Sequence, residues 1–139
     1  MPGGSFLDTN VLLYLDATDA PEKQARAADL WQRLRRSGEG VVSTQVLQEY
    51  YAAATRKLRV QPEIARRRVD LWATLRVVQV TVPTIRAAIV REQSDRLSFW
   101  DALIVQAAIE AGCETLFSED LQTGRRFDGL VIVNPFAVD

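Results

Sequence analysis

Short apolar segments alternate with amphipathic helical patterns along this whole chain, and this alternation restricts the possible folds more than any other feature. Parallel strands need such helical crossovers, so the pattern predicts an α/β fold of three layers, α/β/α, with a central parallel sheet covered by helices on both faces. No linker or repeat interrupts it, so we expect one domain over residues 1–139. The expected strands are 5–7, 41–42, 77–82, 115–117 and 130–133, and the expected helices are 9–15, 22–36, 43–58, 63–75, 83–93 and 98–111, with a helical turn at 121–124.

The chain contains no histidine and only one cysteine. The missing histidine excludes a histidine general base, a Ser-His-Asp triad and histidine metal ligands. Zinc is disfavoured as well, because its usual sites use Cys and His. Sites made only of carboxylates suit hard cations such as Mg²⁺ or Mn²⁺. The single Cys113 has no partner for an intramolecular disulfide and is expected to be a buried structural thiol.

No apolar run approaches about 18 residues, so we expect no transmembrane helix and no membrane partner. Residues 1–4 lack the basic region and the apolar stretch of a signal peptide. These features predict a cytoplasmic protein.

Two acids follow predicted strands. Asp8 interrupts the apolar run from Phe6 to Leu15, where an unpaired carboxylate would be costly to bury. Taken alone, it is well suited to cap the next helix. Asp120 follows Ser118, which can cap the short helical turn after it, and the neighbouring Glu119 competes with Asp120 for any ligand role.

Two further acids lie within predicted helices. Glu49 shares a helix face with Val46, on the side expected to face inward, although a glutamate at the edge of that face could also reach water. Asp101 lies in a segment that is apolar almost all round, which is typical of a buried helix. Ser98 three residues earlier resembles a capping box, so Asp101 could also stabilise the helix start.

The four acids are more informative together than one at a time. Four carboxylates from four separate segments would repel one another unless a cation lay between them. Sites in open α/β sheets form at the carboxyl ends of the strands, which is where Asp8 and Asp120 fall. We therefore expect Asp8, Glu49, Asp101 and Asp120 to meet around a divalent metal that serves nucleic-acid cleavage.

At these residues the chain resembles PIN-domain ribonucleases, and most closely the VapC toxins of bacterial VapBC (type II) toxin–antitoxin systems. The resemblance covers nearly the whole chain, and its specificity lies in the order and spacing of the motifs together. They are Phe6–Leu12, Ser43–Tyr51, Leu97–Ile104 and Phe117–Leu121, followed by the ending Val131–Phe136.

The resemblance implies a PIN-like fold and Mg²⁺- or Mn²⁺-dependent cleavage of RNA. It assigns the four acids to the catalytic metal site, and it assigns Asn10 and Ser118 to support that site through hydrogen bonds. It also implies a homodimer and a VapB-type antitoxin whose C-terminal segment blocks the acidic pocket. An arginine of that partner would satisfy the carboxylates in place of a metal.

Contacts to RNA are expected from basic residues near the predicted pocket. All but two of the 17 basic residues are arginines, which suit phosphate recognition. Arg56, Arg125 and Arg126 are candidates for binding the RNA backbone, whereas Arg66–Arg68 fits a solvated helix face better. Two other functions stay open: a PIN-domain nuclease of RNA processing or DNA maintenance, and a catalytically silent regulator acting through its antitoxin.

Overall fold

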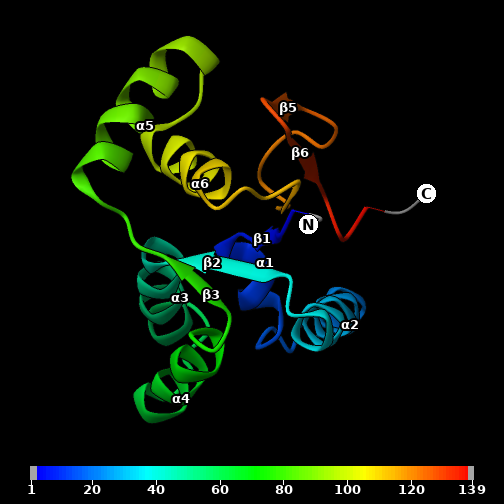
Figure 1. Cartoon of the computed structure of the whole chain (residues 1–139). Helices are drawn as coiled ribbons and strands as arrows, with labels where there is room; N and C mark the ends of the chain where they lie inside the picture. The colour runs from blue at the N-terminus through cyan, green and yellow to red at the C-terminus, as the bar shows by residue number, and fades with distance from the viewer. Residues whose placement is uncertain (1–2, 138–139) are drawn as a thin grey trace.

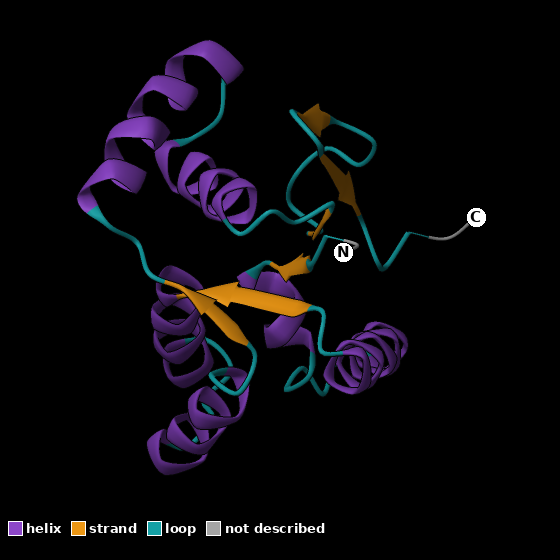
Figure 2. Cartoon of the chain, in the orientation of Figure 1, coloured by secondary structure: helices purple, strands orange, loops and turns teal. Residues whose placement is uncertain are grey.

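A six-stranded sheet forms the centre of the protein (Figures 1 and 2). The computed structural model describes residues 3–137. Met1, Pro2, Val138 and Asp139 lie outside the described residues, so the two ends of the predicted domain and the first half of the segment 1–4 do as well. The sheet order is β3-β2-β1-β4-β6-β5, and every pairing is parallel except that of β5 with β6. The strands are β1 Ser5–Leu7, β2 Gly40–Ser43, β3 Arg76–Val78, β4 Thr115–Phe117, β5 Arg126–Phe127 and β6 Leu130–Val133.

Helices cover both faces of this sheet, as the alternating pattern predicts. Crossovers between parallel strands are right-handed. The chain steps from β1 to β2 to β3 in one direction, which places the first four helices on one face. It then returns to β4 beyond β1, which places the last two on the other face (Figure 1). The helices are α1 Thr9–Tyr14, α2 Pro21–Ser37, α3 Thr44–Arg56, α4 Pro62–Trp72, α5 Val82–Asp95 and α6 Phe99–Glu110.

One main hydrophobic core joins the sheet to α1–α4 and α6 and contains residues from β1 through β6. A small second cluster of Ala88, Ala102 and Leu103 packs α5 against α6. Trp72 of α4 is the largest fully buried side chain of the main core, and it packs edge-to-face against Trp31 and Tyr50. Cys113 lies in the same core, as expected of a structural thiol, and burial raises its pKa to about 11. Within residues 3–137, no helix has the length and apolarity needed to cross a bilayer.

Three predicted elements differ from the structure by more than two residues at an end, or are absent from it. The strand expected at 77–82 ends at Val78, because Thr81 caps α5 and that helix already begins at Val82. The helix expected at 63–75 ends at Trp72, since the chain must turn before β3. Residues 121–124 form bends and a turn without helix, because the Gly124 N–H donates to the Ile132 carbonyl of β6 and draws the chain toward the sheet edge.

Two further features differ from the sequence-based expectations. Strand β5 was not predicted, although Asp128-Gly129 after it is a common hairpin turn. Arg68 does not belong to a solvated face with its neighbours. Its guanidinium forms an ion pair of 2.9 Å with Asp16, whose side chain is only 6% exposed.

Candidate active site

Asp8 lies where the two central strands of the sheet end. Leu7 of β1 pairs with Phe117 of β4, so the next residues, Asp8 and Ser118, leave the sheet side by side. The Asp8 carboxylate is 5% exposed and caps α1 by accepting a 2.8 Å hydrogen bond from the Thr9 N–H. Its other oxygen accepts a 2.8 Å hydrogen bond from the Ser118 hydroxyl and a 3.3 Å bond from the Asn10 amide. The capping role and the inward-facing carboxylate are therefore combined in one residue.

The Asp8 carboxyl group is a much weaker acid than usual, because it is buried. The pKa of Asp8 is raised to about 7: burial is the largest cause and the charges of Glu49 and Asp101 add to it, while the hydrogen bonds from Ser118 and Thr9 oppose it. Near neutral pH the group therefore holds a proton part of the time. A nearby cation would favour the charged form, because an opposite charge within a few ångströms lowers a carboxyl pKa.

Glu49 reaches the site from α3, which begins at the Ser43 cap directly after β2. One oxygen of Glu49 accepts a 2.7 Å hydrogen bond from the Thr9 hydroxyl, and the other accepts a 3.1 Å bond from the Gln45 amide. The sequence analysis did not assign Thr9 or Gln45 to the site. Gln45 precedes Glu49 by one helical turn, and this i, i+4 spacing is the signal that would have identified it.

Asp101 enters from the opposite face of the sheet, in the first turn of α6. The Ser98 hydroxyl caps this helix by accepting from the Asp101 N–H at 3.1 Å, which is one of the two bonds of the predicted capping box. Burial raises the pKa of Asp101, the Ser98 interaction lowers it, and the charges of Asp120 and Glu49 raise it. Asp8 thus interacts electrostatically with Glu49 and Asp101, and Asp101 interacts with Glu49 and Asp120. These interactions connect the four acids into one acidic cluster.

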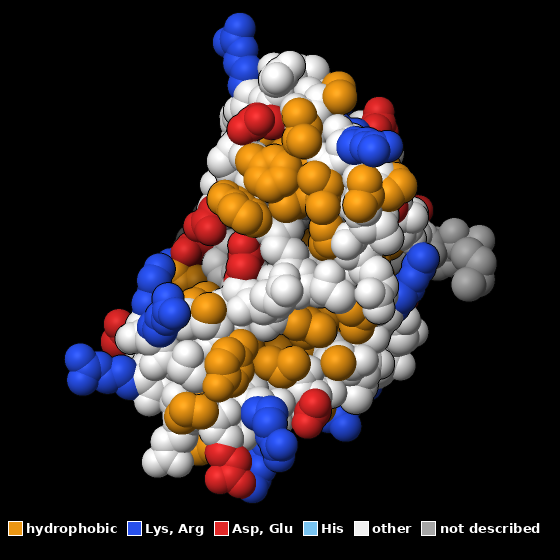
Figure 3. Space-filling view, turned by 90° about the vertical axis from the view of Figure 1, so that its left-hand side faces the viewer, with side chains coloured by type: hydrophobic (Ala, Val, Ile, Leu, Met, Phe, Trp, Pro, Cys, Tyr) orange, Lys and Arg blue, Asp and Glu red, His pale blue; other side chains and the backbone are white. Residues whose placement is uncertain are grey.

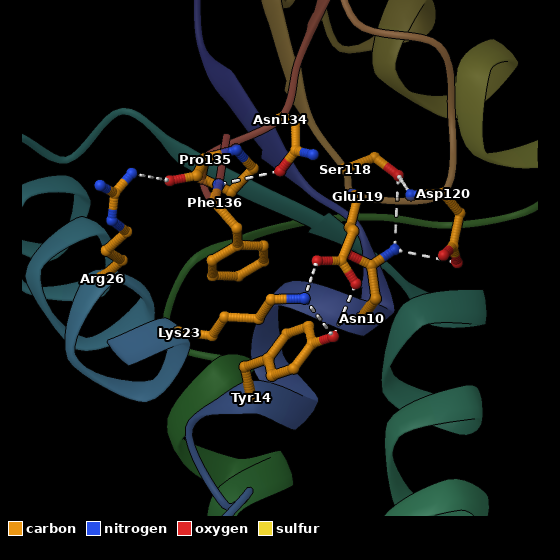
Figure 4. Close-up of polar contacts among 10 residues, drawn as sticks. All are labelled: Asn10, Tyr14, Lys23, Arg26, Ser118, Glu119, Asp120, Asn134, Pro135 and Phe136. Atoms are coloured by element: carbon orange, nitrogen blue, oxygen red, sulfur yellow. Dashed lines mark hydrogen bonds and ion pairs between the residues drawn. The ribbon is translucent and has the colours of Figure 1, made fainter. Parts of the chain in front are cut away.

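Asn10 connects the loop after β1 to the loop after β4 (Figure 4). Its amide nitrogen lies 3.2 Å from an oxygen of Asp120 and 3.3 Å from the Ser118 hydroxyl. Its carbonyl oxygen accepts a 3.1 Å hydrogen bond from the Glu119 N–H. Asn10 and Ser118 thus have the supporting contacts that the resemblance implied, and they position the exposed Asp120.

The Glu119 side chain points away from this cluster (Figure 4). Its carboxylate accepts 2.6 Å hydrogen bonds from the Tyr14 hydroxyl and the Lys23 ammonium group. Burial raises the pKa of Glu119, but the bonds from Lys23 and Tyr14 outweigh it, so its pKa is lowered. The Lys23 ammonium also lies 4.9 Å from the Tyr14 ring centre. Glu119 is therefore neutralised locally, which favours Asp120 over Glu119 as the fourth ligand.

This arrangement gives a direct comparison of neighbouring acids. If the cluster cleaves RNA, as the resemblance implies, Asp120→Asn should lower cleavage by about tenfold or more, whereas Glu119→Gln should change it by less than about threefold. Cleavage of a labelled RNA under single-turnover conditions measures both. A larger loss in Glu119→Gln than in Asp120→Asn would show that the assignment between the two acids is reversed.

The chemistry of the cluster fits a hard divalent cation. Its donors are carboxylate oxygens, with Asn10 and Ser118 beside them, and Mg²⁺ commonly uses one or two carboxylates while keeping several waters. In the described part of the chain, no group of three or more Asp, Glu or Cys side chains is arranged to hold an ion. Instead each of Asp8, Glu49 and Asp120 is occupied by hydrogen-bond donors of the chain.

The three candidate RNA-binding arginines lie in different settings. Arg56 ends α3 and is exposed, two helical turns after Glu49 and on the same side of that helix. Arg125 donates to the Asp95 carbonyl and stacks over the Phe127 ring at 4.5 Å. Arg126 is exposed on the edge strand β5. It pairs with Val131 of β6, which pairs with Thr115 at the start of β4, so Arg126 lies far from the strand ends that carry the acids.

Comparison with known proteins identifies the family. The family described as PIN domain matches residues 5–128, which is most of the chain. The chain belongs to the PIN domain family. Comparison with curated protein sequences gives no significant match.

Several solved structures share this PIN domain's fold. VapC20 of Mycobacterium tuberculosis, described as a sarcin-ricin loop cleaving toxin, superposes with a TM-score of 0.64 at 24% identity, covering 84% of this chain and 90% of that one. A toxin–antitoxin complex from Klebsiella pneumoniae gives 0.70 at 18% identity, covering 97% and 100%. The DNA-bound VapBC of Salmonella typhimurium gives 0.67 at 18%, covering 96% and 98%. All three structures are less than 25% identical to this chain, and their likeness supports the PIN fold.

Proposed function

We propose that this PIN domain is a Mg²⁺- or Mn²⁺-dependent endoribonuclease and the toxin of a type II toxin–antitoxin module. The observation that carries the proposal is the convergence of Asp8, Glu49, Asp101 and Asp120 from four separate segments at the carboxyl edge of a parallel sheet. Mutual repulsion makes such a cluster costly unless a cation binds to it. Because RNA is the substrate, we place the action of the protein in the cytoplasm.

In this proposal Asp8, Glu49, Asp101 and Asp120 hold the ion, and Thr9, Asn10, Gln45 and Ser118 orient them. A bound divalent ion supplies an activated water and stabilises the charge that develops on the phosphodiester. The other residues of the site hold these carboxylates in position. Ser118 and the Thr9 N–H aim the buried Asp8 carboxylate, and Gln45 with the Thr9 hydroxyl holds Glu49 toward it.

An antitoxin has a suitable place beside these acids. A hollow of about 330 Å³ lies next to Asn10 and Asp120, and its wall is apolar at Leu13, Ala53 and Leu58. A peptide segment that combines an apolar side chain with an arginine fits this surface, because the guanidinium can pair with the carboxylates. The Klebsiella neighbour is itself a toxin–antitoxin complex, which supports a VapB-type partner.

A homodimer is supported by the exposed apolar face of α5. Val82, Ile85 and Ile89 recur at helical spacing and are 58%, 36% and 45% exposed. A row of apolar residues on a surface helix is typical of a protein contact. We therefore propose that two copies associate through this face.

The test is the ion dependence of RNA cleavage. The purified protein, freed of antitoxin and treated with EDTA, should leave RNA intact, and adding Mg²⁺ or Mn²⁺ should restore cleavage. The same ions should raise its melting temperature, because a ligand that binds only the folded state stabilises it. Cleavage that continues undiminished in EDTA would contradict the metal mechanism.

Cleavage of RNA but not DNA would separate the toxin from a nuclease of DNA maintenance. An antitoxin reading frame next to the gene would favour the toxin over an RNA-processing role. A protein that binds its antitoxin but cleaves no RNA with either ion would instead match the silent regulator.

Arg56 gives a prediction for substrate binding. If Arg56 contacts the RNA backbone, Arg56→Gln should weaken RNA binding severalfold and reduce the slope of log affinity against log salt by about 0.7, the value for one single-strand phosphate contact. Arg126→Gln tests the second candidate, whereas Arg125 already has partners within the chain. Fluorescence anisotropy at several salt concentrations measures the slopes. An unchanged slope in Arg56→Gln would remove Arg56 from the RNA-binding surface.

A further inference from the structure

Trp100 is a large aromatic side chain placed at the edge of the acidic site and left open to solvent. It is the second residue of α6 and directly precedes Asp101, and it is 61% exposed. The other two tryptophans, Trp31 and Trp72, are 8% and 1% exposed and pack against each other in the core. The indole packs edge-to-face against Phe99 at 5.2 Å but stays mostly exposed, so core packing alone does not explain the position of Trp100.

Trp100 forms one wall of a hollow shared by α3 and α6. The hollow is shallow and open to solvent, with a volume of about 360 Å³. Figure 3 shows the face of the molecule that carries α5 and α3, where hydrophobic side chains gather in an upper and a lower group and acidic side chains lie between them. The residues that line the hollow are Gln45, Gln48, Glu49, Ala52 and Trp100.

Gln45 connects the hollow to the acidic site. Its amide nitrogen donates to Glu49 and to the Trp100 carbonyl, both at 3.1 Å, so the start of α6 is held against a proposed metal ligand. Its amide oxygen is buried and has no hydrogen-bond partner in the described residues. A buried acceptor without a donor is uncommon in folded proteins. Gln45 is therefore a polar residue in the wall of the hollow whose hydrogen bonds within the described residues are incomplete.

We infer that this hollow binds a nucleobase of single-stranded RNA, from a nucleotide beside the cleaved phosphate, by stacking it on Trp100. The inference rests on the proposed ribonuclease function. A phosphate does not suit the hollow, because Glu49 contributes to its wall. A fully apolar side chain does not suit it either, since Gln45 and Gln48 are amides. An uncharged base offers an aromatic face for the indole and polar edges for the amides.

The intrinsic fluorescence of the protein provides the first measurement. Trp31 and Trp72 are buried, so quenching by added RNA reports on Trp100. In an Asp8→Asn background with EDTA, which prevents cleavage, a short single-stranded RNA should quench part of the emission. The same oligonucleotide with abasic sugars should quench less, because it keeps the phosphates and lacks the bases.

Substitution gives the second measurement. Anisotropy of a labelled RNA should show binding weakened by about tenfold or more in Trp100→Ala, and largely recovered in Trp100→Phe, which keeps an aromatic face. Val90→Ala is the matched control, since Val90 is 66% exposed on α5 and does not line the hollow. It should bind RNA as the Asp8→Asn parent does.

Two results would overturn the inference. One is equal RNA affinity of Trp100→Ala and its parent. The other is a change from dimer to monomer in Trp100→Ala by light scattering, which would assign the indole to a contact between copies. Either result leaves ion-dependent cleavage by the wild-type protein intact. Absence of that cleavage would instead remove the proposed function.

Discussion

Asp8→Asn should abolish most RNA cleavage and at the same time stabilise the metal-free protein at pH 8. The loss of cleavage is expected to be about 100- to 1,000-fold, as for other preorganised charges at reacting centres. The gain in stability follows from the same carboxylate. An ionised Asp8 is buried among other acids, whereas asparagine has a similar shape and no charge. Its NH2 group would face donors that now bond to an Asp8 oxygen, which offsets part of the gain.

The sign follows from the acidity of the group. The pKa of Asp8 is about 7 in the folded protein, against an ordinary value of 3.8. Between these values the folded state binds the proton more tightly than the unfolded state, so the free energy of unfolding falls as pH rises from about 4 to about 7. Three pH units correspond to at most about 4 kcal/mol. The variant should escape this loss above pH 7 and show little difference near pH 4.

Urea unfolding in EDTA at pH 4.5 and pH 8 measures the effect. Asp70→Asn is the matched control, because Asp70 is an exposed acid on α4 and should change neither cleavage nor the pH profile. Asp101→Asn should also lose cleavage but gain less stability, since Asp101 is only half-buried. An Asp8→Asn protein that is less stable than the wild type at pH 8 would contradict this account of the site.

Arg68→Ala should destabilise the protein by about 2–3 kcal/mol, the largest effect expected from a charged residue outside the site. It leaves the Asp16 carboxylate, 6% exposed, without its cation. An uncompensated buried charge usually costs about 3–5 kcal/mol, and the partial exposure of Arg68 reduces that figure. The Tyr50 hydroxyl still donates to Asp16 in the variant, so a second substitution, Asp16→Asn, should recover part of the loss.

The neighbouring arginine is the control for this prediction. Arg67 pairs with Glu63 at 3.1 Å on the same helix, but both side chains are about 70% exposed. Exposed pairs of this kind contribute about 0–1 kcal/mol. Arg67→Ala should therefore shift the urea midpoint only slightly. Equal shifts in the two variants would mean that the Arg68–Asp16 pair stabilises the protein no more than the exposed Arg67–Glu63 pair does.

The sequence contains enough information to predict the main strands, the helices and the four acids. β1 and β4 each contain two consecutive buried apolar residues, α6 is mostly apolar, and Ser98 and Gly112 flank α6. β5 was missed because two residues show no periodicity. Which donor holds which carboxylate depends on the register of β1 against β4, and no local pattern encodes that register. The contacts of Ser118 with Asp8 and of Thr9 with Glu49 therefore needed the structure.

The pairing of Leu7 with Phe117 also determines when the acidic site can form during synthesis. The hydrogen bond between Ser118 and Asp8 spans 110 positions of the chain, and β1 can pair with β4 only after all six helices and two other strands have been made. Contacts so distant in sequence form slowly, because a long loop must close first. A nascent chain, or one truncated before β4, therefore lacks the carboxylate cluster, and nuclease activity is confined to molecules that have completed nearly the whole fold.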